Sequence, residues 1–415
     1  MTREREAVIV SCVRTPLCRA KRGSLSQTPP STLLSSAIRG CLARVSPLVK
    51  PSEVQDVCVG NVLQGKTGAA MARMAQIEAM ACEDGGNGVS VPLNVVNRQC
   101  SSGLQAFVNV ADAIVAGHID IGLACGVESM SFNPMHVQEL PQVDWVRMQR
   151  VPDAMDCLTP MGITSENVSE AYGLKRKDLD DFAAMSHSKA AEAQKLGKFD
   201  KEIVSVDNVI MKDDGIRPGT TAEKLSKLRP VFKKRGSTTA GNSSQMTDGA
   251  AAVLVMSREE AEKRGLKIMG VLKSFSVCGV PPKVMGIGPA YAIPMALKEA
   301  MLDVSDIDVF EINEAFASQA SWCVSKLGID PKKVNPNGGA IALGHPLGCT
   351  GVRQITTLLH ELERRQIERD ERKQYGVVSM CIGTGMGAAA VFEVDVEEQD
   401  KADTLNQSIT PRAKL

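Results

Sequence analysis

The sequence has few aromatic residues and no excess of either charge. Aromatics make up 3% of its 415 residues, and Lys plus Arg and Asp plus Glu number 48 each. We therefore expect a core of small and aliphatic side chains that pack closely. The balanced charge argues against nucleic acid or an anionic membrane as the main partner, because both favour a strongly basic surface. Any anionic ligand must be bound by a local group of basic residues.

Metal sites, disulfides and membrane spans also lack a signal. The 12 cysteines form no C-x-x-C pair and no cluster with the 5 histidines. Neither a zinc site nor a disulfide framework is indicated, and a reducing compartment is expected. No apolar run approaches bilayer length, and a charged N-terminus leads straight into the apolar residues 7–10. We expect no transmembrane segment, signal peptide or transit sequence.

Several common enzyme motifs are missing, and one is present by coincidence. The absence of G-x-S-x-G, H-E-x-x-H and G-x-G-x-x-G removes the commoner hydrolase, zinc and dinucleotide interpretations. Residues 60–67 match the phosphate-loop pattern G-x-x-x-x-G-K-[ST]. Val62 and Leu63 are bulky where a phosphate needs exposed backbone, and no apolar strand ends in a magnesium-binding Asp. We therefore disfavour a nucleotide-binding function.

The sequence alternates strand and helix signals in two similar passes. Apolar runs at 7–13, 56–60, 91–96 and 119–125 predict strands, and helical periodicity covers 31–45, 69–80 and 101–116. The order of these signals repeats after residue 250. The segment 306–313 resembles 53–61, and the Gly-rich segment 336–345 leads into a helix as the segment before residue 101 does. This pattern predicts a duplicated α/β fold with a mostly parallel sheet.

The two passes are separated by a polar segment. We predict an N-terminal half at 1–128, an inserted loop domain at 129–249, a return to the first half at 250–270, a C-terminal half at 271–396 and a disordered tail at 397–415. Within the insertion, helices are expected near 164–170 and 176–196. The basic run at 224–235 is compatible with a solvated face or with an anion-binding wall.

Three Gly-rich turns carry the candidate chemical groups. Cys100 stands where an apolar run meets the start of a helix, whose free N–H groups and dipole favour a thiolate, so it is the first candidate nucleophile. His345 and Cys381 lie in the other two turns. Taken singly, His345 fits a structural role better than a catalytic one, and Cys381 fits a small core residue at a strand end.

Together these turns resemble the thiolase family, nearest to its peroxisomal 3-ketoacyl-CoA branch. The resemblance rests on Asn-Arg-Gln-Cys-Ser-Ser-Gly at 97–103, Asn-Glu-Ala-Phe-Ala at 313–317, Gly-His-Pro-Leu-Gly-Cys-Thr-Gly at 344–351 and Cys-Ile-Gly-Thr-Gly-Met-Gly at 381–387. Residues 161–168 and 285–294 indicate the branch. The resemblance implies duplicated five-stranded mixed-sheet halves in α-β-α-β-α layers, with an inserted loop domain.

The resemblance also implies a role for each matching residue. Cys100 would carry the acyl group after His345 removes its proton, and Cys381 would act as general acid and base. His345 and a water held by Asn313 would stabilise one oxyanion, and the N–H groups of Cys100 and Gly383 the other. Arg217 and Ser244 match positions that contact coenzyme A. Coenzyme A would be a substrate, with no permanently bound cofactor.

The implied reaction is cleavage of 3-ketoacyl-CoA in fatty-acid β-oxidation by a homodimer. An acetoacetyl-CoA-forming thiolase, a decarboxylating condensing enzyme and a non-catalytic acyl-CoA or lipid-binding protein are the alternatives. The C-terminal Ala413-Lys414-Leu415 differs by one residue from the Ser-Lys-Leu address and predicts peroxisomal import through its receptor, in place of an N-terminal extension. The segment at 203–214 is expected to be shorter than in close members of the family, which leaves the acyl-chain preference open.

Overall fold

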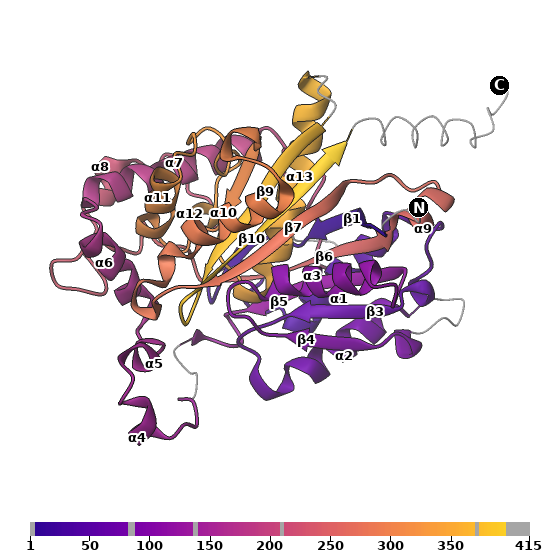
Figure 1. Cartoon of the computed structure of the whole chain (residues 1–415), viewed down its shortest axis with the longest axis horizontal. Coiled ribbons are helices and arrows are strands. Elements are labelled where there is room, and N and C mark those ends of the chain that lie inside the picture. The colour runs from indigo at the N-terminus through magenta and orange to yellow at the C-terminus, as the bar shows by residue number, and fades with distance from the viewer. Residues whose placement is uncertain (1–4, 82–87, 136–139, 208–210, 370–372, 396–415) are drawn as a thin grey trace.

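The computed structural model describes residues 5–81, 88–135, 140–207, 211–369 and 373–395 (Figure 1). Its strands are β1 (Ala7–Arg14), β2 (Cys18–Arg19), β3 (Asp56–Gly60), β4 (Leu93–Val96), β5 (Ile121–Ser129), β6 (Thr247–Ser257), β7 (Gly270–Gly279), β8 (Val309–Ile312), β9 (Lys373–Ile382) and β10 (Met386–Asp395). They are hydrogen-bonded in the order β4-β3-β5-β6-β1-β7-β10-β9-β8, with β2 beside β6. The C-terminal tripeptide and the predicted tail lie outside the described residues.

The strand order confirms the duplication. Outward from the centre, β1-β6-β5-β3-β4 in the first half corresponds to β7-β10-β9-β8 in the second. An isolated parallel bridge between Phe310 and Val334 lies where β4 lies in the first half. The second half therefore has four described strands and a bridge, where five strands were predicted. The halves are joined by a short antiparallel pairing of Val8 with Val271 and Ile9 with Gly270.

The prediction of a mostly parallel sheet was wrong. Among the strands that the structure describes, only the pairs β3/β4, β3/β5 and β8/β9 are parallel. The central strands run antiparallel to their neighbours, as in β5/β6 and β9/β10. Strand-helix alternation predicts parallel pairing only where a helical crossover joins neighbours. Here β10 follows β9 through a tight turn at 383–385, and β6 is reached through the long inserted segment.

Helices cover the two half-sheets in layers. On the first half, α1 (Pro30–Ala43) and α2 (Gly68–Ala79) pack together on one face, while α10 (Gly288–Ala300) packs on β7 and β10 in the second, beside α11 (Ala317–Lys326). Between the halves lie α3 (Ser102–Val115) and α13 (Leu347–Arg369), which contact each other and strands of both halves. This arrangement confirms the α-β-α-β-α layering. The short α9 (Arg258–Lys263) and α12 (Ala340–Leu343) complete the two halves.

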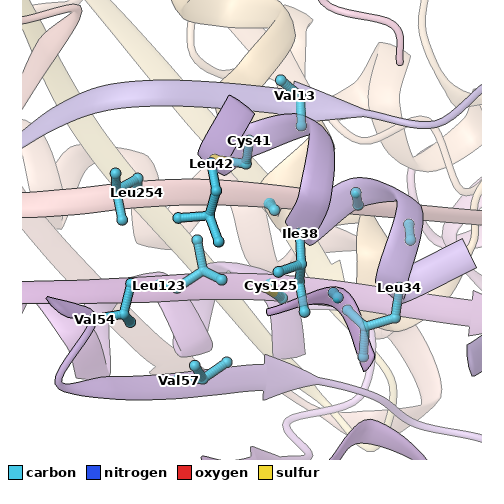
Figure 2. Close-up of a cluster of buried hydrophobic side chains, with 14 of the residues drawn as sticks. Val13, Leu34, Ile38, Cys41, Leu42, Val54, Val57, Leu123, Cys125 and Leu254 are labelled. Carbon is cyan, nitrogen blue, oxygen red and sulfur yellow. The ribbon is translucent and has the colours of Figure 1, made fainter. Parts of the chain in front are cut away.

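The core is built from aliphatic and cysteine side chains, as the composition predicted. Figure 2 shows Leu42 of α1 near Leu123 of β5 and Leu254 of β6, within one hydrophobic cluster. All three side chains are buried. Burying one such side chain contributes about 1.5–3 kcal/mol, so the apolar face of α1 fixes this helix on the sheet. None of the helices in the described ranges is both long and apolar enough to cross a membrane.

The segment between β5 and β6 is helical. It contains α4 (Trp145–Met148), α5 (Pro152–Asp156), α6 (Met161–Ala171), α7 (Arg176–Lys195) and α8 (Ala222–Ser226), and its described residues form no named strand. Buried Arg14 of β1 fastens it to the first half through ion pairs with Glu202 at 2.6 Å and Asp213 at 2.7 Å. Breaking a buried pair typically costs several kcal/mol. The Arg-Thr-Pro sequence at 14–16 therefore has a structural role.

Candidate active site

Glycines bring the starts of α3 and α13 together. A methyl group on Gly103 would lie 2.6 Å from the carbonyl oxygen of Gly348, and one on Gly351 would lie 2.2 Å from a backbone nitrogen of α3. Both distances are closer than real Cβ contacts, so only glycine permits this approach. Cys100 precedes α3 and His345 precedes α13. The close approach of the two helix starts therefore brings these two candidate residues to one region of the molecule.

The Cys100 turn is held in an unusual backbone conformation. Gln99 has a φ of 47°, in the left-handed region that non-glycine residues rarely adopt. The turn is closed by hydrogen bonds from the Ser101 N–H to the Arg98 carbonyl and from the Ser102 N–H to the Gln99 carbonyl, at 3.1 and 3.0 Å. On the other side of the site, Thr384 has a φ of 71°. Strain of this kind is often found at functional sites.

The predicted lowering of the Cys100 pKa was wrong. Cys100 is buried in a cluster that includes Leu63, Met130 and Leu347. Burial raises the pKa of the thiol to about 11, although the backbone N–H groups of Gly383 and of Cys100 itself favour the thiolate. Desolvation outweighs these donors because the sulfur has lost its contact with water. Cys100 therefore needs a neighbouring base to become a nucleophile.

Cys381 lies at the end of β9, next to the turn that carries Gly383. Its side chain is fully buried and packs with Met285, Ala315 and Phe316. Burial raises the pKa of the thiol well above its usual range, and the nearby Cys100 thiol raises it further. The Gly383 N–H is directed at the Cys100 sulfur. The structure thus brings Cys100, Cys381 and Gly383 close together.

His345 is buried and held by hydrogen bonds on both sides of its ring. Its Nδ1 lies 2.6 Å from the Thr350 hydroxyl, and its Nε2 lies 3.4 Å from Nδ2 of Asn313. Since the Asn313 amide N–H donates to Nε2, the Nδ1–H donates to Thr350. Burial, aided by the positive charge of Arg353, lowers the pKa of His345 to about 3. His345 is therefore a neutral imidazole with its lone pair on Nε2.

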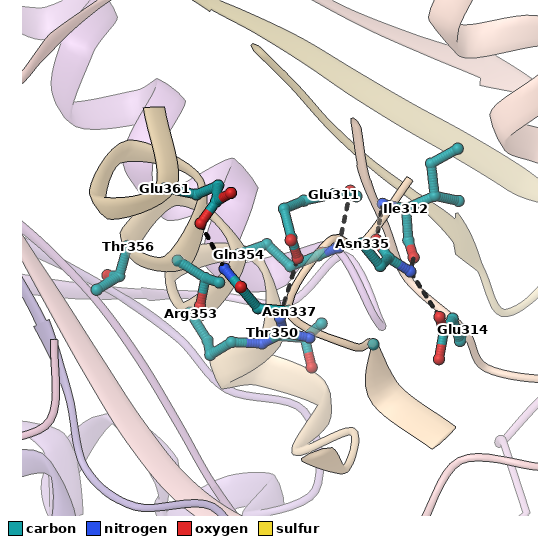
Figure 3. A network of polar contacts seen from close by, with 12 residues as sticks. Glu311, Ile312, Glu314, Asn335, Asn337, Thr350, Arg353, Gln354, Thr356 and Glu361 are labelled. Atoms are coloured by element: carbon teal, nitrogen blue, oxygen red, sulfur yellow. Dashed lines mark hydrogen bonds and ion pairs between the residues drawn. The ribbon is translucent and has the colours of Figure 1, made fainter. Parts of the chain in front are cut away.

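A buried polar network joins the strand end that carries Asn313 to α13 (Figure 3). The Glu311 carbonyl accepts from Gln354 at 2.9 Å, and its carboxylate pairs with Arg353 at 3.2 Å. Asn335 bonds both backbone groups of Ile312 at 2.9 Å. These contacts fix β8 against the helix that follows His345. They explain how Asn313 and His345, which are far apart in the sequence, are held at a fixed distance from each other.

The glycines of the 381–387 turn have different roles. A methyl group on Gly383 would meet its neighbours at 3.8 Å or more, so the protein leaves open space there. One on Gly385 would lie 2.4 Å from the Val280 carbonyl oxygen, and one on Gly387 would lie 2.3 Å from Gly288. Of these three glycines, only Gly383 therefore leaves room beside the backbone for a ligand. The other two permit close packing of the chain.

Ser244 and Arg217 lie at the edge of this region. The Ser244 N–H donates to the Ala315 carbonyl at 2.9 Å, which places it beside the Asn313 turn. Arg217 is exposed, and its backbone N–H donates to Nδ1 of His187 at 3.3 Å. Burial and the charge of Arg217 lower the pKa of His187 to about 4. The Gly215 carbonyl, two residues before Arg217, accepts a hydrogen bond from the Gln245 side chain at 2.8 Å.

The phosphate-loop pattern holds a carboxylate of the protein itself. The N–H groups of Val62 and Leu63 both donate at 3.1 Å to buried Glu128, which also accepts the Gly348 N–H at 3.0 Å. This carboxylate occupies the donors that a phosphate would need and sits at the positive end of α13. Burial raises the pKa of Glu128 to about 7. The disfavoured nucleotide interpretation finds no support in this geometry.

Sequence reasoning missed three residues that organise the site. Thr350 orients His345, Glu128 joins three segments around Cys100, and His187 supports the backbone of Arg217. Thr350 could have been found from its place in the His345 turn. Glu128 and His187 carry no sequence signal, because their partners are distant backbone groups.

Comparisons with known proteins agree with this geometry. Residues 7–259 match the model of the thiolase N-terminal domain and residues 266–394 that of the thiolase C-terminal domain. The chain is 54% identical to the human peroxisomal 3-ketoacyl-CoA thiolase, over 94% of this chain and 91% of that one. The dimeric peroxisomal thiolase of Saccharomyces cerevisiae is 45% identical with a TM-score of 0.86, covering 94% of this chain and 98% of that one. A human mitochondrial 3-ketoacyl-CoA thiolase in complex with CoA has a TM-score of 0.81 and 35% identity, with the same coverage.

Proposed function

Since the chain belongs to the thiolase family of acyltransferases, we propose that it cleaves 3-ketoacyl-CoA with coenzyme A in fatty-acid β-oxidation. The products are acetyl-CoA and an acyl-CoA shortened by two carbons. The observation that carries this proposal is the paired burial of Cys100 and Cys381 beside the Gly383 N–H. Two neighbouring buried thiols suit a reaction that needs a nucleophile and a separate acid and base.

In the first stage, the Cys100 sulfur attacks the 3-keto carbon while Nε2 of His345 takes its proton. The raised pKa of Cys100 makes such a base necessary, and the lowered pKa of His345 keeps it unprotonated beforehand. The tetrahedral oxyanion accepts hydrogen bonds from the backbone N–H groups of Cys100 and Gly383. The carbon–carbon bond then breaks, Cys381 protonates the acetyl-CoA enolate at carbon, and Cys100 keeps the acyl group.

In the second stage, the Cys381 thiolate takes the proton of a coenzyme A thiol, which attacks the acyl carbon. Cys100 leaves as a thiolate and recovers its proton from His345. His345 and a water held by Asn313 serve the oxygen of the acetyl-CoA portion. Preorganised donors of this kind can be worth about 3–4 kcal/mol of transition-state stabilisation each. Atoms and protons balance over the two stages without a resident cofactor.

Coenzyme A is therefore proposed as a substrate that binds along the inserted segment. Ser244 lies beside the Asn313 turn, where the pantetheine arm would pass, and exposed Arg217 would meet the nucleotide. We retain the division into halves at 1–128 with 250–270 and at 271–396, with an inserted domain at 129–249. The dimeric yeast relative and the peroxisomal relatives support a homodimer and a peroxisomal location. Import through Ala413-Lys414-Leu415 is part of the proposal.

An acetoacetyl-CoA thiolase is the alternative with the same residues, since either direction uses the same two thiols. A non-catalytic acyl-CoA-binding protein would have no use for a second buried thiol. The proposal is tested by incubating the protein with 3-ketoacyl-CoA alone and locating an acyl adduct on Cys100 by mass spectrometry. Cys100→Ala should form no adduct and lose turnover. Wild-type turnover in this variant would overturn the mechanism.

A further inference from the structure

A basic loop at residues 229–239 lies over the face of α6. The side chains of Arg229, Lys233, Lys234 and Arg235 in this loop are exposed. Such a group of cations would attract phosphates, but long exposed side chains bind weakly unless the backbone beneath them is fixed. The contacts between the basic loop and α6 therefore decide what it can bind.

Glu166 of α6 fastens the basic loop through its backbone. The Glu166 side chain is 2% exposed, and its carboxylate accepts the N–H of Thr238 at 2.8 Å and that of Ser237 at 2.9 Å. The Ser237 hydroxyl donates to the same carboxylate at 3.2 Å. Ser165, one residue earlier, bonds the Thr238 hydroxyl at 2.7 Å. Hydrogen bonds to a charged acceptor are stronger than neutral ones, so Glu166 is the main attachment of the loop.

Gly162, one turn before Glu166, accommodates an aromatic ring of the basic loop. A methyl group on Gly162 would lie 2.3 Å from ring atoms of Phe232. Phe232 is 41% exposed and meets Phe316 edge-on, with ring centroids 6.5 Å apart. Phe316 in turn packs against Cys381. The Phe232 ring thus connects the basic loop, through Phe316, with the side chains packed around Cys381.

The first residue of α6 also packs near Cys381. Met161 packs against the cluster of Met285 and Cys381, and Asn167 donates to the Lys283 carbonyl at 2.8 Å. The helix α6 therefore contacts the side chains around Cys381, the Phe232 ring and the basic loop. This accounts for the Met-Gly-Ile-Thr-Ser-Glu-Asn-Val sequence at 161–168, which the mechanism does not use.

We propose that α6 is the template that sets the basic loop and Phe232 in position for coenzyme A, with Glu166 as the positioning residue. The proposal rests on the proposed function. Glu166 touches neither the reacting atoms nor the exposed cations. Its effect is therefore on the affinity for a thiol that carries a nucleotide.

The test compares coenzyme A with pantetheine, the same thiol arm without the nucleotide, as acceptor at saturating 3-ketoacyl-CoA. Glu166→Gln replaces an acceptor oxygen by a donor facing backbone N–H groups. The KM for coenzyme A should rise about tenfold or more, with kcat within about twofold of wild type and an unchanged KM for pantetheine. Glu259→Gln is the matched control, because Glu259 is an exposed carboxylate on α9 in the first half, outside α6 and the basic loop, and should change neither value.

Gly162→Ala is the second variant, and it decides the question if Glu166→Gln does not fold. Alanine favours the helix more than glycine does, while its methyl group displaces the Phe232 ring. The same rise in KM for coenzyme A alone is expected. An unchanged KM for coenzyme A, or an equal loss with pantetheine, would overturn the template role. Absence of thiolysis in the wild-type protein would instead refute the proposed function.

Discussion

Thr350→Val tests the orientation of His345. The Thr350 side chain is fully buried, and its hydroxyl lies 2.6 Å from Nδ1 of the His345 ring. Valine has nearly the same shape but cannot accept the Nδ1–H. In the variant, either that N–H is left without a partner, or the proton moves to Nε2 and faces the amide N–H of Asn313. Both arrangements leave a buried donor unsatisfied.

The expected losses of stability and of kcat follow from these two proton positions on the His345 ring. An unsatisfied buried donor costs about 1–3 kcal/mol, so the free energy of unfolding should fall by about that amount. In the second arrangement Nε2 has no lone pair for the Cys100 proton. A tautomer penalty of about 1.4–2.8 kcal/mol corresponds to a 10- to 100-fold loss of kcat. The KM for coenzyme A should change little, because Thr350 lies away from the inserted segment.

The measurements are a urea titration and the burst of acyl-enzyme formation followed by stopped flow. Thr356→Val is the control, since Thr356 is equally buried on the same helix but bonds only the Val352 carbonyl, at 3.0 Å. That carbonyl has a helical partner, so the control should lose less than about 1 kcal/mol and no activity. A Thr350→Val protein with the wild-type burst rate would refute the tautomer assignment.

Three further predictions follow from the buried groups and the C-terminus. Cys381→Ala should abolish turnover, with acyl-CoA binding measured by calorimetry retained; unchanged turnover would remove its acid and base role. Burial lowers the pKa of His187 to about 4, so its stabilising contribution is complete above pH 6.5 and is lost as the pH falls towards 4. His187→Asn, which keeps an acceptor for the Arg217 N–H, should flatten the decline of Tm between pH 6.5 and 4, and an unaltered slope would contradict the assignment. Removing Ala413-Lys414-Leu415 should leave a fluorescently tagged protein in the cytosol, and peroxisomal fluorescence would exclude this address.

Much of the fold could be predicted from periodicity. The β3 boundaries agree with the prediction, and α7 ends one residue earlier than predicted. Strand direction could not be predicted in this way, because a strand followed by a helix does not reveal which strand it pairs with. β10 was not predicted, although its apolar run at 388–392 is of the same kind as the runs that predicted β1 and β5.

The sequence by itself determined the candidate chemistry, through Cys100, His345, Asn313 and Cys381 in their glycine-rich turns. Only the tertiary structure decided the state of these groups. At a helix start, Cys100 was expected to be a ready thiolate, but burial raises its pKa to about 11. Desolvation depends on what surrounds the sulfur, and those neighbours come from segments far apart in the chain. The acidity of the thiol is therefore a property of the fold, whereas its identity as the nucleophile candidate could be derived from the sequence.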